Sequence, residues 1–182
     1  MRMFRTKLAL TALLMAAPLF GAGQAAAAEP ISYGGDCVLQ PDNRAATVAA
    51  LNTKCNGYQL YDIYSKATPG TVPNGRKAGL VNTPSIMVPI ASPLWYGKVF
   101  FTGGSGGYLT NQTIAGDMVN ADVRLGPSPL DGKPAWVLDY TNSPAPFIVD
   151  EIREVTPGVW FGYSWWRREA GEKTPLLTFI LS

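Results

Sequence analysis

Three short apolar runs near the C-terminus, separated by turn residues, constrain the fold more than any other part of the sequence. They cover residues 136–140, 147–155 and 159–166, and Asp-Gly, Ser-Pro and Pro-Gly pairs lie before and between them. Short runs rich in β-branched and aromatic side chains, bounded by such pairs, are typical of strands. This part of the chain therefore predicts consecutive antiparallel strands joined by tight turns.

Similar patterns elsewhere bring the number of predicted strands to about seven. In residues 118–125 apolar and polar side chains alternate, which indicates a strand with one buried and one wet face. Several short strands at regular spacing are typical of a sandwich or a barrel. We favour a small antiparallel barrel, because the turns are hairpin-like and the chain is too short for two full sheets plus helices. The further strands are predicted at residues 76–81, 94–101 and 176–181.

One or two short helices are predicted before the barrel. Asp42 or Asn43 can cap a helix at residues 44–51, where alanine is frequent. Residues 58–64 carry apolar side chains at helical spacing, which favours a second helix, although their tyrosines also suit a strand. The predicted fold class is therefore a mainly β chain in which short N-terminal helices precede the barrel.

Glycines mark two special places in the predicted strands. Gly97, inside the strand at 94–101, indicates a β-bulge or a close backbone approach. Residues 102–108 are glycine-rich and follow that strand, a pattern shared with phosphate-binding loops. No Lys-Ser or Lys-Thr pair follows, and no helix is predicted behind the loop. We therefore interpret residues 102–108 as the tip or mouth loop of a hairpin.

The first 28 residues have the composition of a secretory signal peptide. Arg2, Arg5 and Lys7 precede an apolar run at residues 8–20, and a series of small residues ends at Ala28. A membrane anchor is the alternative, but the run is shorter than the ~20 residues that span a bilayer. We expect cleavage after Ala28, a secreted or periplasmic protein, and no membrane span in the remainder.

The remainder, residues 29–182, is nearly neutral. It carries 12 basic and 13 acidic residues, because three of the 15 basic residues of the chain lie in the leader. Such a domain lacks the electrostatic footprint of a protein that binds nucleic acid or an anionic membrane, so neither partner is predicted.

We assign residues 29–66 to a disulfide-tied arm with the short helices, and residues 67–182 to the barrel.

Two cysteines and the absence of histidine limit the chemistry that is open to the chain. In an oxidising compartment Cys37 and Cys55 are expected to form a disulfide rather than a reactive thiol pair, since their spacing is far from Cys-x-x-Cys. Without histidine, Ser-His-Asp and Cys-His catalysis and histidine-ligated metal sites are excluded. We predict no metal site and no cofactor. Acid–base chemistry would have to come from Asp, Glu, Lys, Tyr or a bound cofactor.

Charged residues inside the strand at 147–155 mark a candidate site. Alternation places Glu151 and Arg153 on one face and Asp150 on the other, and each face also carries apolar residues. If these charges point into a barrel, they form an ionic network at the floor of a pocket. If they point outward, they are solvated surface charge. Asp139, on a neighbouring strand, is the expected partner of Arg153.

Aromatic residues are concentrated in the predicted strands, where they serve first in core and cross-strand packing. Trp165 and Trp166 are adjacent, so they must point to opposite faces. A hollow barrel lined with aromatic rings and a filled barrel that exposes some of them both satisfy this pattern. The candidate lining residues are Trp95, Trp136, Tyr140 and Trp160, with Glu151 and Arg153 as candidate polar anchors.

Four stretches carry a resemblance to known proteins: residues 94–100 (LWYGKVF), 130–135 (LDGKPA), 138–140 (LDY) and 150–158 (DEIREVTPG). Together they resemble uncharacterised secreted bacterial proteins with a lipocalin-like (calycin) β-barrel. The resemblance covers the C-terminal half of the chain. It implies a cup for a small, mostly apolar molecule, and it transfers no catalytic residue.

The leading hypothesis is a secreted or periplasmic barrel that binds a hydrophobic or amphipathic small molecule in an aromatic-lined cavity. One alternative is a histidine-free enzyme of the isomerase, cyclase or lyase type in the same cavity. Another is an envelope module that binds a protein through exposed aromatics. The sequence names neither the ligand nor the oligomeric state. The candidate catalytic residues are Lys98, Asp139, Tyr140, Asp150 and Glu151.

Overall fold

The computed structural model describes residues 27–169 and 171–182. The predicted signal peptide, residues 1–28, falls almost entirely outside these ranges and stays a prediction. Within the described ranges, no helix combines the length and the apolar character needed to cross a membrane.

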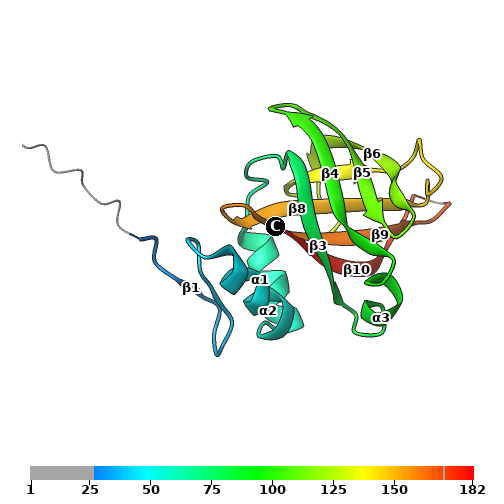
Figure 1. Ribbon diagram of the computed structural model, residues 1–182. Coiled ribbons are helices and arrows are strands. Elements are labelled where there is room, and N and C mark those ends of the chain that lie inside the picture. Colours follow the sequence, from blue (N-terminus) through cyan, green and yellow to red (C-terminus); the bar gives the residue numbers. More distant parts are fainter. Residues whose placement is uncertain (1–26, 170) are drawn as a thin grey trace, which may run out of the picture.

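Eight antiparallel strands close into one barrel, in which each strand pairs with the next along the chain and the last pairs with the first (Figure 1). Closure comes from β10 and β3, where Phe179 lies opposite Val81 and Leu181 opposite Gly79. The predicted fold class is therefore confirmed. The strands are β3 (Gly75–Thr83), β4 (Trp95–Gly103), β5 (Gly106–Thr113), β6 (Gly116–Pro127), β7 (Pro134–Asp139), β8 (Ile148–Thr156), β9 (Val159–Arg167) and β10 (Lys173–Leu181).

The strand that the sequence did not predict is β5. Only Leu109 is a fully buried apolar residue there, whereas Asn111 and Gln112 are buried and polar. Because β5 buries hydrogen-bonded amides, it lacks the alternation of apolar and polar residues that identifies a strand. The glycine-rich segment before it is the tip of the β4–β5 hairpin, as predicted, and Gly103 pairs with Gly106 across the turn.

Both predicted helices are present and lie against the outside of the barrel (Figure 1). They are α1 (Arg44–Thr53) and α2 (Gly57–Lys66), and a short two-stranded arm, β1 (Ile31–Ser32) and β2 (Val38–Leu39), precedes them. Asn56 and Gln59 form a capping box at the start of α2. The predicted disulfide between Cys37 and Cys55 is also present, and it ties the arm to the segment between the two helices.

The barrel wall is buried on both faces where the helices cover its outside. One cluster fills the interior and includes Phe100, Leu138 and Ile152. A second cluster joins Tyr64 of α2 to Phe161 of β9 on the outer face. Strands β8 and β9 are therefore buried on both faces, which explains the near-continuous apolar run of β9, whereas β8 also carries four charged residues.

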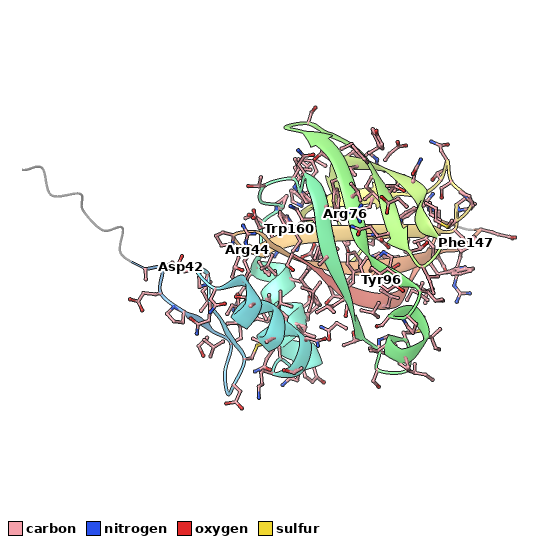
Figure 2. All side chains as sticks on the ribbon, viewed as in Figure 1. Asp42, Arg44, Arg76, Tyr96, Phe147 and Trp160 are labelled. Atoms are coloured by element: carbon pink, nitrogen blue, oxygen red, sulfur yellow. A yellow bond between two sulfur atoms is a disulfide. The ribbon has the colours of Figure 1, made fainter. Side chains whose placement is uncertain are left out.

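The two ends of the barrel differ. Residues 68–73 cover one end, where the indole N–H groups of Trp136 and Trp160 donate to the backbone carbonyls of Gly70 (3.2 Å) and Thr71 (2.9 Å). We call this the plugged end. At the other end, the short helix α3 (Val88–Ala91) lies within the connection from β3 to β4. Figure 2 shows Trp160 and Phe147 toward these opposite ends.

Candidate functional site

A cavity of about 280 Å³ lies inside the barrel at the α3 end. Ala91 of α3 and Ala145 of the β7–β8 connection border it, and a group of polar side chains forms its floor. The lining residues are Val81, Ala91, Trp95, Lys98, Asn111, Thr113, Val119, Tyr140, Ala145, Ile148, Asp150, Ser164, Leu176, Leu177 and Phe179.

Gly97 determines how β4 enters this site. The register between β4 and β5 shifts between Trp95 and Gly97, which is the predicted bulge. Gly97 has φ +139°, and a Cβ atom there would lie 2.1 Å from the carbonyl oxygen of Lys77 on β3. A side chain does not fit, so glycine is required at this close approach. On either side of it, Trp95 and Lys98 both line the cavity.

Lys98 is the centre of the polar floor. Its side chain is buried, and Nζ donates to Asn111 Oδ1 (2.8 Å), Tyr140 OH (2.6 Å) and Asp150 Oδ2 (2.9 Å). These three contacts match the three N–H donors of an ammonium group. Burial lowers the pKa of Lys98 from its ordinary value, although the Asp150 carboxylate acts in the opposite direction.

Two aromatic rings lie against the same ammonium group. Nζ lies 5.3 Å from the ring centre of Trp95 and 5.2 Å from that of Phe179, whereas Tyr140 contacts it through the hydroxyl group. Cations within about 6 Å of a ring centre are attracted by the π-face. The rings therefore support a charge that is removed from water, and they also supply apolar wall to the cavity.

Asn111 connects the floor to the strand pair β5–β6. Its Oδ1 accepts from Lys98 and from the Trp95 indole N–H (2.9 Å), while Nδ2 donates to the carbonyl of Val119 (2.8 Å) and to Tyr140 OH (3.2 Å). Val119 has φ +62°, an unfavourable conformation for a β-branched residue. This strained backbone positions the carbonyl that fixes Asn111, and such strain is concentrated at functional sites.

Asp150 and Tyr140 complete the floor. Tyr140 OH donates to Asp150 Oδ2 (3.1 Å), which also accepts from Lys98. Burial and, second, the Asp150 charge raise the pKa of Tyr140 well above its usual range. The other carboxylate oxygen, Asp150 Oδ1, is buried and has no hydrogen-bond partner.

Only some of the predicted aromatic residues meet this cavity. Trp95 and Tyr140 line it. Trp136 and Trp160 do lie in the barrel interior, but they pack at the plugged end and do not line the cavity. The tryptophans at the plugged end fill one part of the barrel, so the interior is neither wholly hollow nor wholly filled.

The predicted polar anchors, Glu151 and Arg153, lie on the outer face of the barrel, and neither lines the cavity. Both are fully buried, so neither of the two alternatives for these charges describes them. Arg153 forms a bidentate pair with Asp131 (2.7 and 2.8 Å), not with Asp139, and its guanidinium lies 4.4 Å from the Tyr64 ring centre. The reason is that α2 and the β6–β7 connection cover this face.

Among the candidate catalytic residues, the structure brings together Lys98, Tyr140 and Asp150. Asp139 instead pairs with Arg167 (2.9 Å) and Arg124 (3.3 Å), away from the cavity lining. Its register explains this, because Asp139 lies opposite Val149 rather than Arg153.

Sequence reasoning missed Asn111, Ser164 and Phe179 as members of the site. Asn111 lies in the unpredicted strand β5, and an isolated amide in a polar stretch carries no distinguishing pattern. Ser164 is the cross-strand neighbour of Asp150, so the β8–β9 register places it beside the floor. Among residues 27–169 and 171–182, no group of three or more Cys, Asp or Glu side chains could hold a metal ion.

Comparisons with known proteins found no relative from which the role of the site could be inferred. No family model, no curated protein and no solved structure matches the chain. The eight-stranded antiparallel barrel is therefore established without a family.

Proposed function

We propose that this barrel binds a small amphipathic molecule. The apolar part of the ligand occupies the cavity at the α3 end, and its polar end meets the floor formed by Lys98, Asn111, Tyr140 and Asp150. The volume of about 280 Å³ lies just below the usual range for ligand pockets, which begins at about 300 Å³. The proposed ligand is therefore small.

One observation carries the proposal: an apolar-walled cavity ends on a buried ion pair with an unpartnered carboxylate oxygen. Ligand pockets combine mostly apolar walls with a few well-placed polar groups that orient the ligand. A barrel that only needed a solid core would be better served by apolar side chains, because a buried ion pair is weak evidence for stability.

We also propose that the protein acts outside the cytoplasm, as the leader at residues 1–28 suggests. The disulfide between Cys37 and Cys55 supports this location, because such bonds persist in oxidising compartments. N-terminal sequencing of exported protein tests it, and an intact Met1 would contradict cleavage of the leader.

Displacement of a fluorescent probe tests the binding function. N-phenyl-1-naphthylamine is uncharged and brightens in apolar surroundings, so we expect it to bind wild-type protein with one-to-one stoichiometry. Octan-1-ol is expected to displace it. An absence of probe binding, together with an absence of octanol binding by calorimetry, would contradict the proposal.

A matched pair of variants locates the binding. Ala91→Phe places a ring at the border of the cavity, whereas Ala49→Phe makes the same change on the exposed face of α1, outside the barrel. We expect probe affinity to fall at least tenfold in Ala91→Phe and to stay unchanged in Ala49→Phe. Equal losses in both variants would place the probe elsewhere.

A second candidate function is acid–base catalysis in the same cavity. The specific observation is the direct contact of Lys98, Tyr140 and Asp150, which places an amine, a phenol and a carboxylate within hydrogen-bond distance of one another. Such groups can move protons without histidine. This is the chemistry required of the isomerase, cyclase or lyase alternative.

Deuterium exchange tests this second candidate. The cyclic ketone 2-tetralone is incubated with the protein in D₂O, and exchange next to the carbonyl is followed by NMR. Exchange that is faster with wild type than with Lys98→Met, both at equal concentration of folded protein, supports catalysis. Equal rates in the two proteins would contradict it.

A further inference from the structure

The hydrogen bonds of the polar floor leave one position open. All three Lys98 donors are used, and the Asn111 amide donates twice and accepts twice. Tyr140 OH donates once and accepts twice, and Asp150 Oδ2 accepts twice. Asp150 Oδ1 alone has no partner, although Asp150 is 95% buried, with a relative exposure of 5%.

An open acceptor on a buried carboxylate is unfavourable unless something donates to it. Buried polar atoms are nearly always hydrogen-bonded, and the exceptions need an explanation such as a functional role. Asp150 lines the cavity, but Oδ1 itself is covered, so a ligand reaches this oxygen only when the carboxylate turns toward the cavity. A hydrogen-bond donor on a bound ligand would then supply the missing partner.

The charges of the floor determine what kind of donor fits. Lys98 and Asp150 form an ion pair at 2.9 Å, so the floor has no net charge. A ligand carboxylate would bring a second anion next to Asp150, and it would find no free donor on Lys98. A ligand ammonium would bring a second cation next to Lys98. An uncharged donor avoids both repulsions.

We propose that the cavity selects uncharged amphiphiles that carry a hydroxyl or N–H group at the polar end, and that this group donates to Asp150 Oδ1. This inference rests on the proposed binding function and narrows its ligand class. It distinguishes the protein from a fatty-acid carrier, since a carboxylate at neutral pH accepts hydrogen bonds and does not donate them.

Three ligands of similar size test the selection. Octan-1-ol and 1-methoxyheptane are isomers that differ in the presence of a donor, and octanoate adds a negative charge. Their affinities for wild-type protein are measured at pH 7 by displacement of N-phenyl-1-naphthylamine. We expect octan-1-ol to bind about tenfold more tightly than the ether, which is a difference of about 1.4 kcal/mol in binding free energy. We expect octanoate to bind more weakly than the ether.

The outcomes separate this inference from the proposed function. Equal affinities for alcohol and ether, or tighter binding of octanoate, would overturn the donor selection while leaving binding in place. If neither the probe nor any of the three ligands binds, the binding function fails and the selection fails with it.

A variant and its control test the role of Asp150 directly. Asp150→Asn keeps the shape but replaces one carboxylate oxygen by a donor, so the preference for alcohol over ether is expected to fall to about one. Asp122→Asn makes the same change at an exposed position of β6 and is expected to keep the preference. An unchanged preference in folded Asp150→Asn would overturn the assignment. If circular dichroism shows that Asp150→Asn does not fold, the three ligand affinities of the wild-type protein alone test the donor selection.

Discussion

The buried ion pair between Lys98 and Asp150 allows one substitution to be predicted in magnitude. We expect Lys98→Met to lower the free energy of unfolding by about 3–5 kcal/mol, because removal of one partner leaves the other charge buried without compensation. Methionine keeps an unbranched apolar chain that fills the same space. The change therefore isolates the ammonium group rather than creating a large cavity.

The contacts of Nζ support this magnitude. Lys98→Met removes three hydrogen bonds of 2.6–2.9 Å, and Asp150 keeps only the hydroxyl of Tyr140. Hydrogen bonds to charged groups contribute about 1.5–3 kcal/mol each, but bonds within one network do not add independently. The expected loss is thus below their sum, and it is large compared with the 5–15 kcal/mol that stabilises a typical domain.

Urea denaturation followed by circular dichroism measures the effect. The double variant Lys98→Met/Asp150→Asn removes both charges, so it is expected to recover most of the stability that Lys98→Met loses. Lys66→Met serves as a matched control, since it removes an ion pair with Asp62 whose two side chains are 65% and 45% exposed. The control is expected to lose at most about 1 kcal/mol.

Two results would refute this reasoning. A loss in Lys98→Met as small as that of Lys66→Met would mean that the Lys98 ammonium group is hydrated rather than buried. A double variant no more stable than Lys98→Met would mean that the loss comes from packing and not from an uncompensated charge.

Three further predictions follow from other parts of the molecule. Burial raises the pKa of Glu151 above its ordinary value of 4.5, so stability is expected to fall as pH rises from about 4.5 through the raised folded pKa. Glu151→Gln should weaken this dependence in urea titrations at several pH values, and an unchanged slope would contradict it. Replacing both Cys37 and Cys55, 18 positions apart, by Ser should cost about 3 kcal/mol in urea denaturation, less any strain in the bond, and an unchanged midpoint would contradict it. Gly97→Ala should lower the thermal midpoint far more than Gly103→Ala, whose added Cβ would meet nothing within 4 Å, and equal shifts would contradict the close approach at Gly97.

The barrel could be predicted from sequence because its strands follow local rules. Alternation, turn dipeptides and short spacing identify seven of the eight strands, and those signals need no knowledge of the partners. Strand β5 was not predicted because the buried polar residues Asn111 and Gln112 interrupt its apolar pattern. Their burial is tolerated only because other strands supply hydrogen-bond partners, such as the carbonyl of Lys98 for Gln112 (3.0 Å). No local pattern contains that information.

The site was harder to predict than the fold, because its members come from different strands. Lys98 lies 42 residues from Tyr140 and 52 residues from Asp150 in the chain. Each was a candidate by residue type alone, and only barrel closure brings them together. Alternation in β8 correctly separates Asp150 from Glu151, but it does not decide which faces inward, since both faces of this strand are buried.

Strand β8 carries buried polar side chains on both faces of the barrel, and the two sets have different roles. On the outer face, Arg153 donates to the carbonyl of Tyr64 (2.9 Å) and pairs with Asp131, so it joins α2 and the β6–β7 connection to the strand. On the inner face, Asp150 keeps an oxygen without a partner. Hydrogen-bonded polar networks stiffen a structure, although the outer cluster also contains two buried atoms without a partner, Tyr64 OH and Glu151 Oε2. Because Arg153 fixes β8 to α2 and the tryptophans fill the plugged end, Asp150 is held in a rigid wall, as the proposed binding site requires.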